Sequence, residues 1–282
     1  MRIPTFIFWI AVTGAITPIH AQWLNYPTPG TPLTRDGKPD LSAKAPRAAN
    51  RKPDLSGVWA IQPPPAGEIE RLYGDLGATI VAGDDPRSFS RYWANILIDF
   101  KRGEEPLRPE AAAVTLKNRQ TMDNPDSHCL PISVAVRNLT PFPFKVFQTS
   151  DAIVILYEGD GAARQIHTDG RKLPENPHPS WMGYSTGKWV GDTLVVDTAG
   201  FNDRGWLDTR GHPRSEALHI QERFHRRDFG HMDVEETIDD PNILTQSVTI
   251  KYTELLVPNS DVLENFCTEG ERDRAYISAQ GH

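Results

Sequence analysis

From about residue 144 onward, short apolar or alternating runs are separated by sequences typical of tight turns. The turns are rich in Gly, Asp, Asn and Pro, as in Gly-Asp-Gly at 159–161 and Asp-Pro-Asn at 240–242. Connections this short join antiparallel strands and leave no room for parallel crossovers. The pattern predicts a mainly β fold, an antiparallel meander that closes into a barrel or a strongly curled sheet. The predicted strands are 144–149, 152–157, 163–168, 182–189, 193–198, 216–227, 231–239, 246–256 and 261–266.

One or two helices are predicted to pack on this sheet from its N-terminal side. Over residues 86–102, aromatic and aliphatic side chains recur at helical spacing, and a glycine ends the run. The apolar stripe, which includes Trp93, Leu97 and Phe100, is expected to be core rather than a cofactor site. A second, weaker helix is predicted at 109–120, because proline favours a first helical position.

The N-terminal region has the pattern of an exported protein. Residues 1–21 combine an early arginine, an apolar run and a small final residue, which is typical of a secretory signal. The alternative is a membrane anchor, but the run is shorter than the roughly 20 residues that span a bilayer. Residues 22–52 are rich in proline and charge and are expected to be a flexible tether before a single β domain at 53–282. We therefore expect a periplasmic or secreted protein with no membrane partner after signal cleavage.

Export also bears on the two cysteines. Cys129 and Cys267 are expected to form a disulfide, because an oxidising compartment allows it and neither lies in a motif that activates a thiol. A catalytic thiol is the alternative. The net charge of −7, with no stripe of lysine or arginine, argues against a nucleic-acid partner. The expected partner is a small molecule.

Several motifs resemble those of secreted proteins of environmental bacteria. They are Pro-Asp-Leu-Ser-Gly-Val-Trp at 53–59, Gly-Lys-Trp-Val-Gly-Asp-Thr-Leu-Val-Val-Asp-Thr at 187–198 and Gly-Phe-Asn-Asp at 200–203. The resemblance covers about 53–270 and implies secretion and a mostly β fold, but no activity. The Gly-Val-Trp at the end of the first motif also looks similar to the tripeptide that plugs the closed end of lipocalin-like barrels.

The hairpin predicted at 216–239 can be assigned a register. A tight loop between its strands places Glu222 opposite Glu236 on the apolar face. On the other face it sets Arg223 opposite Glu235, and this charge complementarity supports the register. The two glutamates are therefore expected to lie side by side.

Three interpretations of this pair are open. Contact and burial raise the pKa of Glu222 and Glu236, so one should be protonated near neutral pH and the two could act as general acid and base. Alternatively, Arg164 or Arg171 neutralises the pair in a buried salt bridge. In the third interpretation, the sheet is open and both carboxylates are in water.

Other candidates lie in the loops around this hairpin. His212, in a Gly-His-Pro loop, suits proton transfer or metal ligation, and Asp197 is a further acid–base candidate. His219 is expected to face Asp239 as a surface ion pair. Rings beside polar groups suit a carbohydrate or aromatic ligand, although the tryptophans could instead cap the barrel. These ligand-binding candidates are Arg171, His178, Trp181, Asn202 and Trp206.

Two functions are consistent with these residues. The first is a cofactor-independent acid–base enzyme, a lyase, isomerase or hydrolase that acts on a small glycoside or aromatic compound. The second is a periplasmic small-molecule binding protein without catalysis. No HxH, HExxH or Cys/His cluster is present, so neither a metal nor another cofactor is expected. The two functions differ in whether ionisable side chains converge on a cavity.

Overall fold

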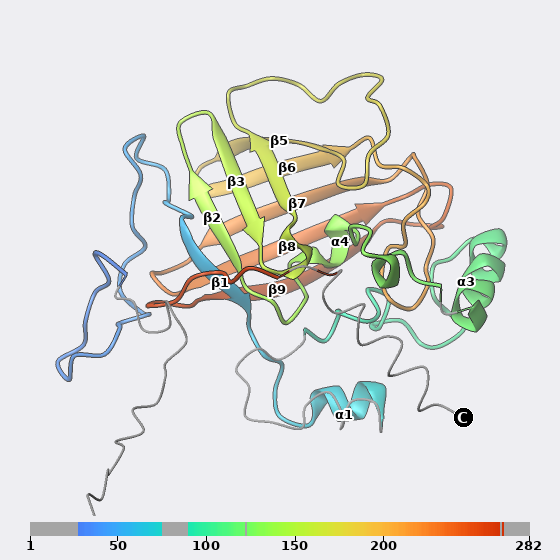
Figure 1. The fold of residues 1–282 in the computed structure, drawn as a ribbon, viewed down its shortest axis with the longest axis horizontal. Coiled ribbons are helices and arrows are strands. Elements are labelled where there is room, and N and C mark those ends of the chain that lie inside the picture. The colour runs from blue at the N-terminus through green and yellow to red at the C-terminus, as the bar shows by residue number, and fades with distance from the viewer. Residues whose placement is uncertain (1–27, 75–89, 122, 266, 268–282) are drawn as a thin grey trace, which may run out of the picture.

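The structure, a computed structural model, describes residues 28–74, 90–121, 123–265 and 267. Nine strands form one closed barrel in chain order, and β9 pairs with β1 to close it (Figure 1). The prediction of a mainly β barrel is confirmed. The predicted signal sequence lies outside the described residues.

The strands match the turn-bounded runs of the sequence. They are β1 (Gly57–Ile61), β2 (Phe144–Gln148), β3 (Ala152–Tyr157), β4 (Ala163–His167), β5 (Tyr184–Val190), β6 (Thr193–Ala199), β7 (His219–Arg226), β8 (His231–Asp239) and β9 (Val248–Leu256). The strand predicted at 261–266 is wrong, because residues 261–265 are irregular. Since β1 occupies the free side of β9, the closed barrel has no edge left for a further strand.

One strand pair is parallel, which corrects the prediction of a purely antiparallel meander. Ile166 of β4 pairs with Ser185 of β5, and the two strands run in the same direction. The connection at 168–183 is long enough to return the chain to the starting end of β4, and Figure 1 shows it as a yellow loop at the top of the view. All other neighbouring pairs are antiparallel.

Helices are few and short. The described helices are α1 (Glu68–Tyr73), α3 (Pro109–Thr121) and α4 (Val134–Arg137), with the 3-10 turns η1 (Pro125–His128) and η2 (Gly159–Gly161). The helix predicted at 109–120 is confirmed as α3. Among the described residues, no helix combines the length and apolar character needed to cross a bilayer.

The helix predicted at 86–102 is absent from its described part, 90–102, which consists of turns. The amides of residues 93, 95, 98 and 100 bond to carbonyls three residues back. The amide of Ile96 instead donates to the carboxylate of Asp208 at 3.0 Å. Partners distant in sequence thus replace the regular helical bonds, an effect that local spacing does not reveal.

Part of the predicted apolar stripe is nevertheless core. Leu97 is fully buried, and Phe100 is partly buried against the same cluster. Trp93, by contrast, is only half-buried. The turns therefore dock through Leu97 more than through Trp93.

Residues 28–56 lie against the barrel in two similar loops. The amide of Thr34 donates to the carbonyl of Lys38 at 2.8 Å, and that of Ala48 donates to Lys52 at 2.9 Å. These bonds fall at equivalent places in the two copies of Lys-Pro-Asp-Leu-Ser at 38–42 and 52–56. A sequence repeat thus gives a repeat of structure.

Both loops are fastened to the barrel. The amide of Gly230, between β7 and β8, donates to the carbonyl of Leu41 at 2.7 Å. Arg47 makes two hydrogen bonds of 2.6 Å with Asp192, in the turn between β5 and β6. Composition predicts a flexible tether at 22–52, whereas the described part of it, 28–52, is bonded to the barrel.

Side chains fill the barrel interior as two apolar clusters. One, which includes the residues of α4, contains Leu97, Leu139, Ile220, Ile238 and Ile250. The other contains Trp59, Phe144, Ile153, Val196 and Leu256. A hollow within the second cluster holds about 10 Å³, roughly the space of one water. The described interior therefore has no chamber of ligand size.

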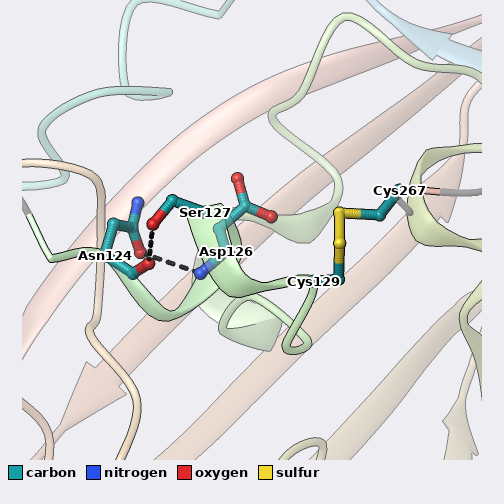
Figure 2. Close-up of a disulfide and its surroundings, with 5 residues drawn as sticks. All are labelled: Asn124, Asp126, Ser127, Cys129 and Cys267. Carbon is teal, nitrogen blue, oxygen red and sulfur yellow. Dashed lines mark hydrogen bonds between the residues drawn. A yellow bond between two sulfur atoms is a disulfide. The ribbon is translucent and has the colours of Figure 1, made fainter. Parts of the chain in front are cut away.

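A disulfide joins Cys129 to Cys267, which are 138 residues apart, as the sequence predicts (Figure 2). Cys129 directly follows η1, whose first turn is capped by Asn124. The side chain of Asn124 accepts the amide of Asp126 at 3.2 Å, and its carbonyl accepts the hydroxyl of Ser127 at 2.6 Å. The disulfide thus ties the chain beyond β9 to a capped turn that precedes β2.

Candidate functional site

The predicted register of the β7–β8 hairpin is confirmed. Glu222 lies opposite Glu236, and Arg223 lies opposite Glu235. Neither Glu222 nor Glu236 is exposed to solvent. Both point into the barrel because alternate residues of a strand share one face.

Arg164 of β4 neutralises Glu222. Its guanidinium donates to both carboxylate oxygens, at 2.9 Å for Nη1 to Oε1 and at a shorter distance for Nη2 to Oε2. It also donates to the hydroxyls of Ser185 at 3.1 Å and Thr198 at 2.8 Å. Every nitrogen of the guanidinium is therefore occupied, as a buried arginine requires.

Glu236 has no such cation. Its Oε2 accepts the hydroxyl of Tyr252 at 3.2 Å, and its Oε1 has no hydrogen-bond partner among the described residues. Burial, together with the charge of Glu222, raises the pKa of Glu236 well above 4.5. Glu236 is therefore the member of the pair that keeps its proton to higher pH.

Asn138, which follows α4, links the two sides of this network. The hydroxyl of Tyr157 donates to Asn138 Oδ1 at 3.0 Å, and Asn138 Nδ2 donates to the hydroxyl of Tyr252 at 3.4 Å. With the bonds of Arg164 and Glu236, the polar side chains form a layer across the barrel, which we call the polar belt. It consists of Asn138, Tyr157, Arg164, Ser185, Thr198, Glu222, Glu236 and Tyr252.

Sequence reasoning missed a third interior carboxyl group, Glu254 on β9. It is not exposed, and neither of its oxygens has a hydrogen-bond partner in the part of the chain that the structure describes. Burial raises the pKa of Glu254 well above 4.5. Strand alternation could have identified it, because Glu254 shares a face with the apolar Ile250 and Leu256.

His212 belongs to a separate cluster in the loop between β6 and β7. Its Nδ1 lies 2.7 Å from Oδ2 of Asp208, and both side chains are buried. The Nε2 of His212 is buried without a partner in the described residues. Asp208, whose contact with His212 the sequence did not predict, thus orients the imidazole.

Arg214 organises the same loop. Its buried guanidinium donates to the carbonyl and the side-chain oxygen of Asn202, both at 2.8 Å. The rings of Trp181 and Phe201 lie 5.7 and 5.5 Å away, and burial lowers the pKa of Arg214 to about 10. Arg204 also lies 5.1 Å from the ring of Trp181. Trp181 and Asn202 therefore hold the loop together through contacts within the protein.

Arg171 and His178 do not join these clusters, whereas Trp206 lies in the His212 loop and forms a β-bridge with Pro213. Arg171 pairs with Asp169 at 2.6 Å, on the surface. His178 is exposed, and Trp206 is half-buried. The predicted site residues thus separate into the polar belt, the His212 loop and the surface.

Asp197 points outward from β6. It accepts a hydrogen bond from Gln221 at 3.0 Å and lies 3.3 Å from Nε2 of His219. His219 is opposite Asp239 in register, as predicted, but its ion pair is with Asp197. This correction follows from the twist of the sheet, which brings diagonal neighbours within reach.

Surface hollows are much larger than the interior one. The hollow that we call the end cleft lies between residues 28–58 and the barrel and has a volume of about 360 Å³. Most of its lining is apolar, and a buried arginine, Arg226, forms part of its wall. The other lining residues are Thr28, Pro29, Gly30, Pro46, Asp54, Ser56, Gly57, Val58, Phe229, Leu256, Val257 and Pro258.

Arg226 lies between two rings, 4.9 Å from Trp59 and 5.3 Å from Phe229. Its guanidinium donates to main-chain carbonyls, including those of Asp54 and Phe229 at 2.5 Å. Burial lowers the pKa of Arg226 to about 10, so it remains a cation at neutral pH. Within the described residues it makes no ion pair with a carboxylate. The end cleft therefore has a positive charge in its wall.

Comparison with known proteins found no family model that matches the chain and no match among curated proteins. Within the described ranges, no three His, Cys, Asp or Glu side chains are grouped so that they could hold a metal ion.

Proposed function

We propose that the protein is an exported binding protein that holds a small molecule in the end cleft. The observation that carries this proposal is the combination of a mostly apolar hollow of about 360 Å³ with a buried cation in its wall. Ligand pockets typically have volumes of about 300–1,000 Å³ and a few fixed polar groups among apolar ones. The disulfide is compatible with export, because such bonds persist in oxidising compartments.

The charge of the cleft suggests the class of ligand. Carbonyl oxygens satisfy N–H groups of Arg226, and the nearby charges of Asp54 and Asp228 favour its cationic form without forming an ion pair with it among the described residues. An anionic group close to Arg226 would gain from this charge in a poorly solvated setting. Val58, Phe229 and Leu256 offer an apolar surface beside it. We therefore propose an amphipathic anion, with a carboxylate or sulfonate on an apolar body.

Burial of the polar belt favours binding over catalysis by the glutamate pair. Glu222 and Glu236 are both at 0 % exposure, and Arg164 occupies the carboxylate of Glu222. A substrate would have to open the barrel to reach either group. The end cleft, in contrast, is open at the surface.

Binding of 8-anilinonaphthalene-1-sulfonate, an apolar sulfonate, tests the proposal. We expect fluorescence enhancement with the folded protein, and Val257→Glu should weaken binding at least about tenfold because it adds a negative charge and bulk to the cleft. The matched control is Val190→Glu, at a position 51 % exposed and outside the cleft. Circular dichroism verifies that each variant is folded. Equal binding by all three proteins would contradict the proposal.

An acid–base enzyme acting on a small glycoside or aromatic compound is the second candidate. The observation that favours it is the unpartnered Nε2 of His212, with Nδ1 held by Asp208. This imidazole is also buried, so its loop would have to open to admit a substrate. Its test is release of nitrophenol from aryl glycosides and aryl esters. If the protein is such an enzyme, it should turn over one of these substrates and His212→Gln should abolish that turnover. If the glutamate pair takes part, Glu236→Gln should also abolish turnover in a folded protein. Turnover unchanged in both variants would reject it.

A further inference from the structure

A second hollow, of about 330 Å³, lies apart from the end cleft and carries three guanidinium groups. It is bounded by α1, the turns at 95–105, α3 and the loop that contains Asp208 and His212. Arg102, Arg119 and Arg210 line it, together with one carboxylate, Glu105. We call it the arginine hollow.

These three arginines line one hollow without a carboxylate partner in the described part of the chain. Within the described residues, none of the three forms an ion pair, and the carboxylate of Glu105 instead accepts the amide of Gly103 at 2.6 Å. Some exposed arginines elsewhere do pair with carboxylates at 2.6 to 2.7 Å, as in Arg47 with Asp192, Arg171 with Asp169 and Arg227 with Asp233. Three unpaired cations around one hollow are notable in a chain with a net charge of −7.

Two of the arginines are held in place by the protein. The Nε of Arg119 donates to the carbonyl of Arg210 at 2.9 Å, which links α3 to the loop. The guanidinium of Arg210 lies 6.0 Å from the ring of Tyr73. Because these contacts use only part of each guanidinium, N–H groups remain available for an anion. Bringing like charges together is unfavourable, and a bound anion would relieve that repulsion.

The rest of the lining indicates an organic ligand. Leu72, Ile98 and Phe100 are all partly buried and form an apolar wall beside the arginines, and Asn95 adds a polar group. Three cations against one carboxylate match a doubly charged oxyanion better than a single carboxylate. We propose that the arginine hollow binds a small organic dianion, a phosphate or sulfate ester on a compact apolar group. This site is independent of the one proposed in the end cleft.

Calorimetric titration with phenyl phosphate and with inorganic phosphate at low ionic strength tests this proposal. We expect phenyl phosphate to bind more tightly, because only it contacts the apolar wall. Arg102→Gln should weaken its binding about tenfold or more. Arg102→Lys should recover part of the loss, since lysine keeps the charge but not the planar fork. Arg102 makes no hydrogen bond to the described residues that Arg102→Gln would remove, and Arg171→Gln is the matched surface control.

Three results would overturn the proposal. They are no heat of binding with either phosphate, equal affinities for wild type and Arg102→Gln, or an equal loss in Arg171→Gln. Val257→Glu, which blocks the end cleft, should leave phenyl phosphate binding unchanged. A loss in Val257→Glu alone would place the anion in the end cleft and would likewise overturn the arginine hollow as a site.

Discussion

Glu222 and Glu236 face each other across β7 and β8 with neither side chain exposed, yet Arg164 neutralises only Glu222. The asymmetry decides where the proton resides. Glu222 is stabilised as an anion by two hydrogen bonds from a cation, whereas ionised Glu236 would be a second charge beside it. The barrel therefore folds around one ion pair, and beside it lies a carboxyl group whose proton is held more tightly.

This arrangement makes stability depend on pH. In an unfolded chain, the pKa of a glutamate is close to 4.5. The pKa of Glu236 in the folded protein is raised well above that value, so the folded state holds a proton that the unfolded state releases. The contribution of Glu236 to the free energy of unfolding is therefore fully present below about pH 4.5. As the pH rises towards the folded pKa, the free energy of unfolding falls by up to about 1.4 kcal/mol per pH unit. Glu254 acts in the same direction. Glu236→Gln should flatten this dependence, measured by urea unfolding from about pH 5 to about pH 8.

The control for this prediction is Glu235→Gln. Glu235 neighbours Glu236 on the same strand but faces outward, and its side chain is 39 % exposed. Its substitution should leave the pH dependence nearly as in the wild type. If Glu236→Gln and the wild type lose stability equally between the two pH values, Glu236 is ionised in the folded barrel.

Arg164 and Glu222 should behave as one energetic unit. Arg164→Met leaves Glu222 buried without its cation and should lower the free energy of unfolding by about 3–5 kcal/mol. Arg164→Met combined with Glu222→Gln should recover much of that loss, because no uncompensated charge remains. Urea unfolding of the four proteins gives the coupling between the two sites. Additive losses would show that Arg164 and Glu222 are not energetically coupled.

The strands and the β7–β8 register could be predicted because both depend on local rules. Alternation fixes which face each residue of a strand occupies, and opposite charges select one pairing of the hairpin. The buried position of Glu222 beside Glu236 follows from these rules alone. The choice of Arg164 over Arg171 does not, since it depends on how β4 meets β7 across the barrel.

The remaining errors come from contacts between residues distant in sequence. Turns replace the predicted helix where Ile96 bonds to Asp208, 112 residues away. The parallel pairing of β4 and β5 depends on the path of the connection at 168–183. The length of this connection alone does not determine whether the two strands run parallel or antiparallel. The contact between Asp208 and His212 depends on the conformation of the loop that holds both, which the sequence pattern does not determine.

Leu97 should contribute more to stability than an exposed leucine does. It is fully buried, so Leu97→Ala should cost about 2–5 kcal/mol through lost burial and the resulting cavity. Leu116, on α3, is 59 % exposed, and Leu116→Ala should change stability by less than about 0.5 kcal/mol. Denaturant unfolding of both variants makes the comparison. If Leu97→Ala lowers the free energy of unfolding as little as Leu116→Ala does, residues 90–102 are not docked on the barrel in solution.

The disulfide should stabilise the folded protein mainly through the unfolded chain. Cys129 and Cys267 are 138 residues apart, and closing a loop of that length restricts the unfolded ensemble by about 5 kcal/mol in the chain-entropy model. Replacing both cysteines with serine should therefore lower the free energy of unfolding by an amount near that value. Non-reducing peptide mapping by mass spectrometry of exported protein should find the cross-linked peptide.

The polar belt lies inside the barrel, away from this link, so the serine variant should retain the pH dependence due to Glu236. If both thiols are free in exported protein, the cross-link does not form in the cell and the serine variant should unfold as the wild type does.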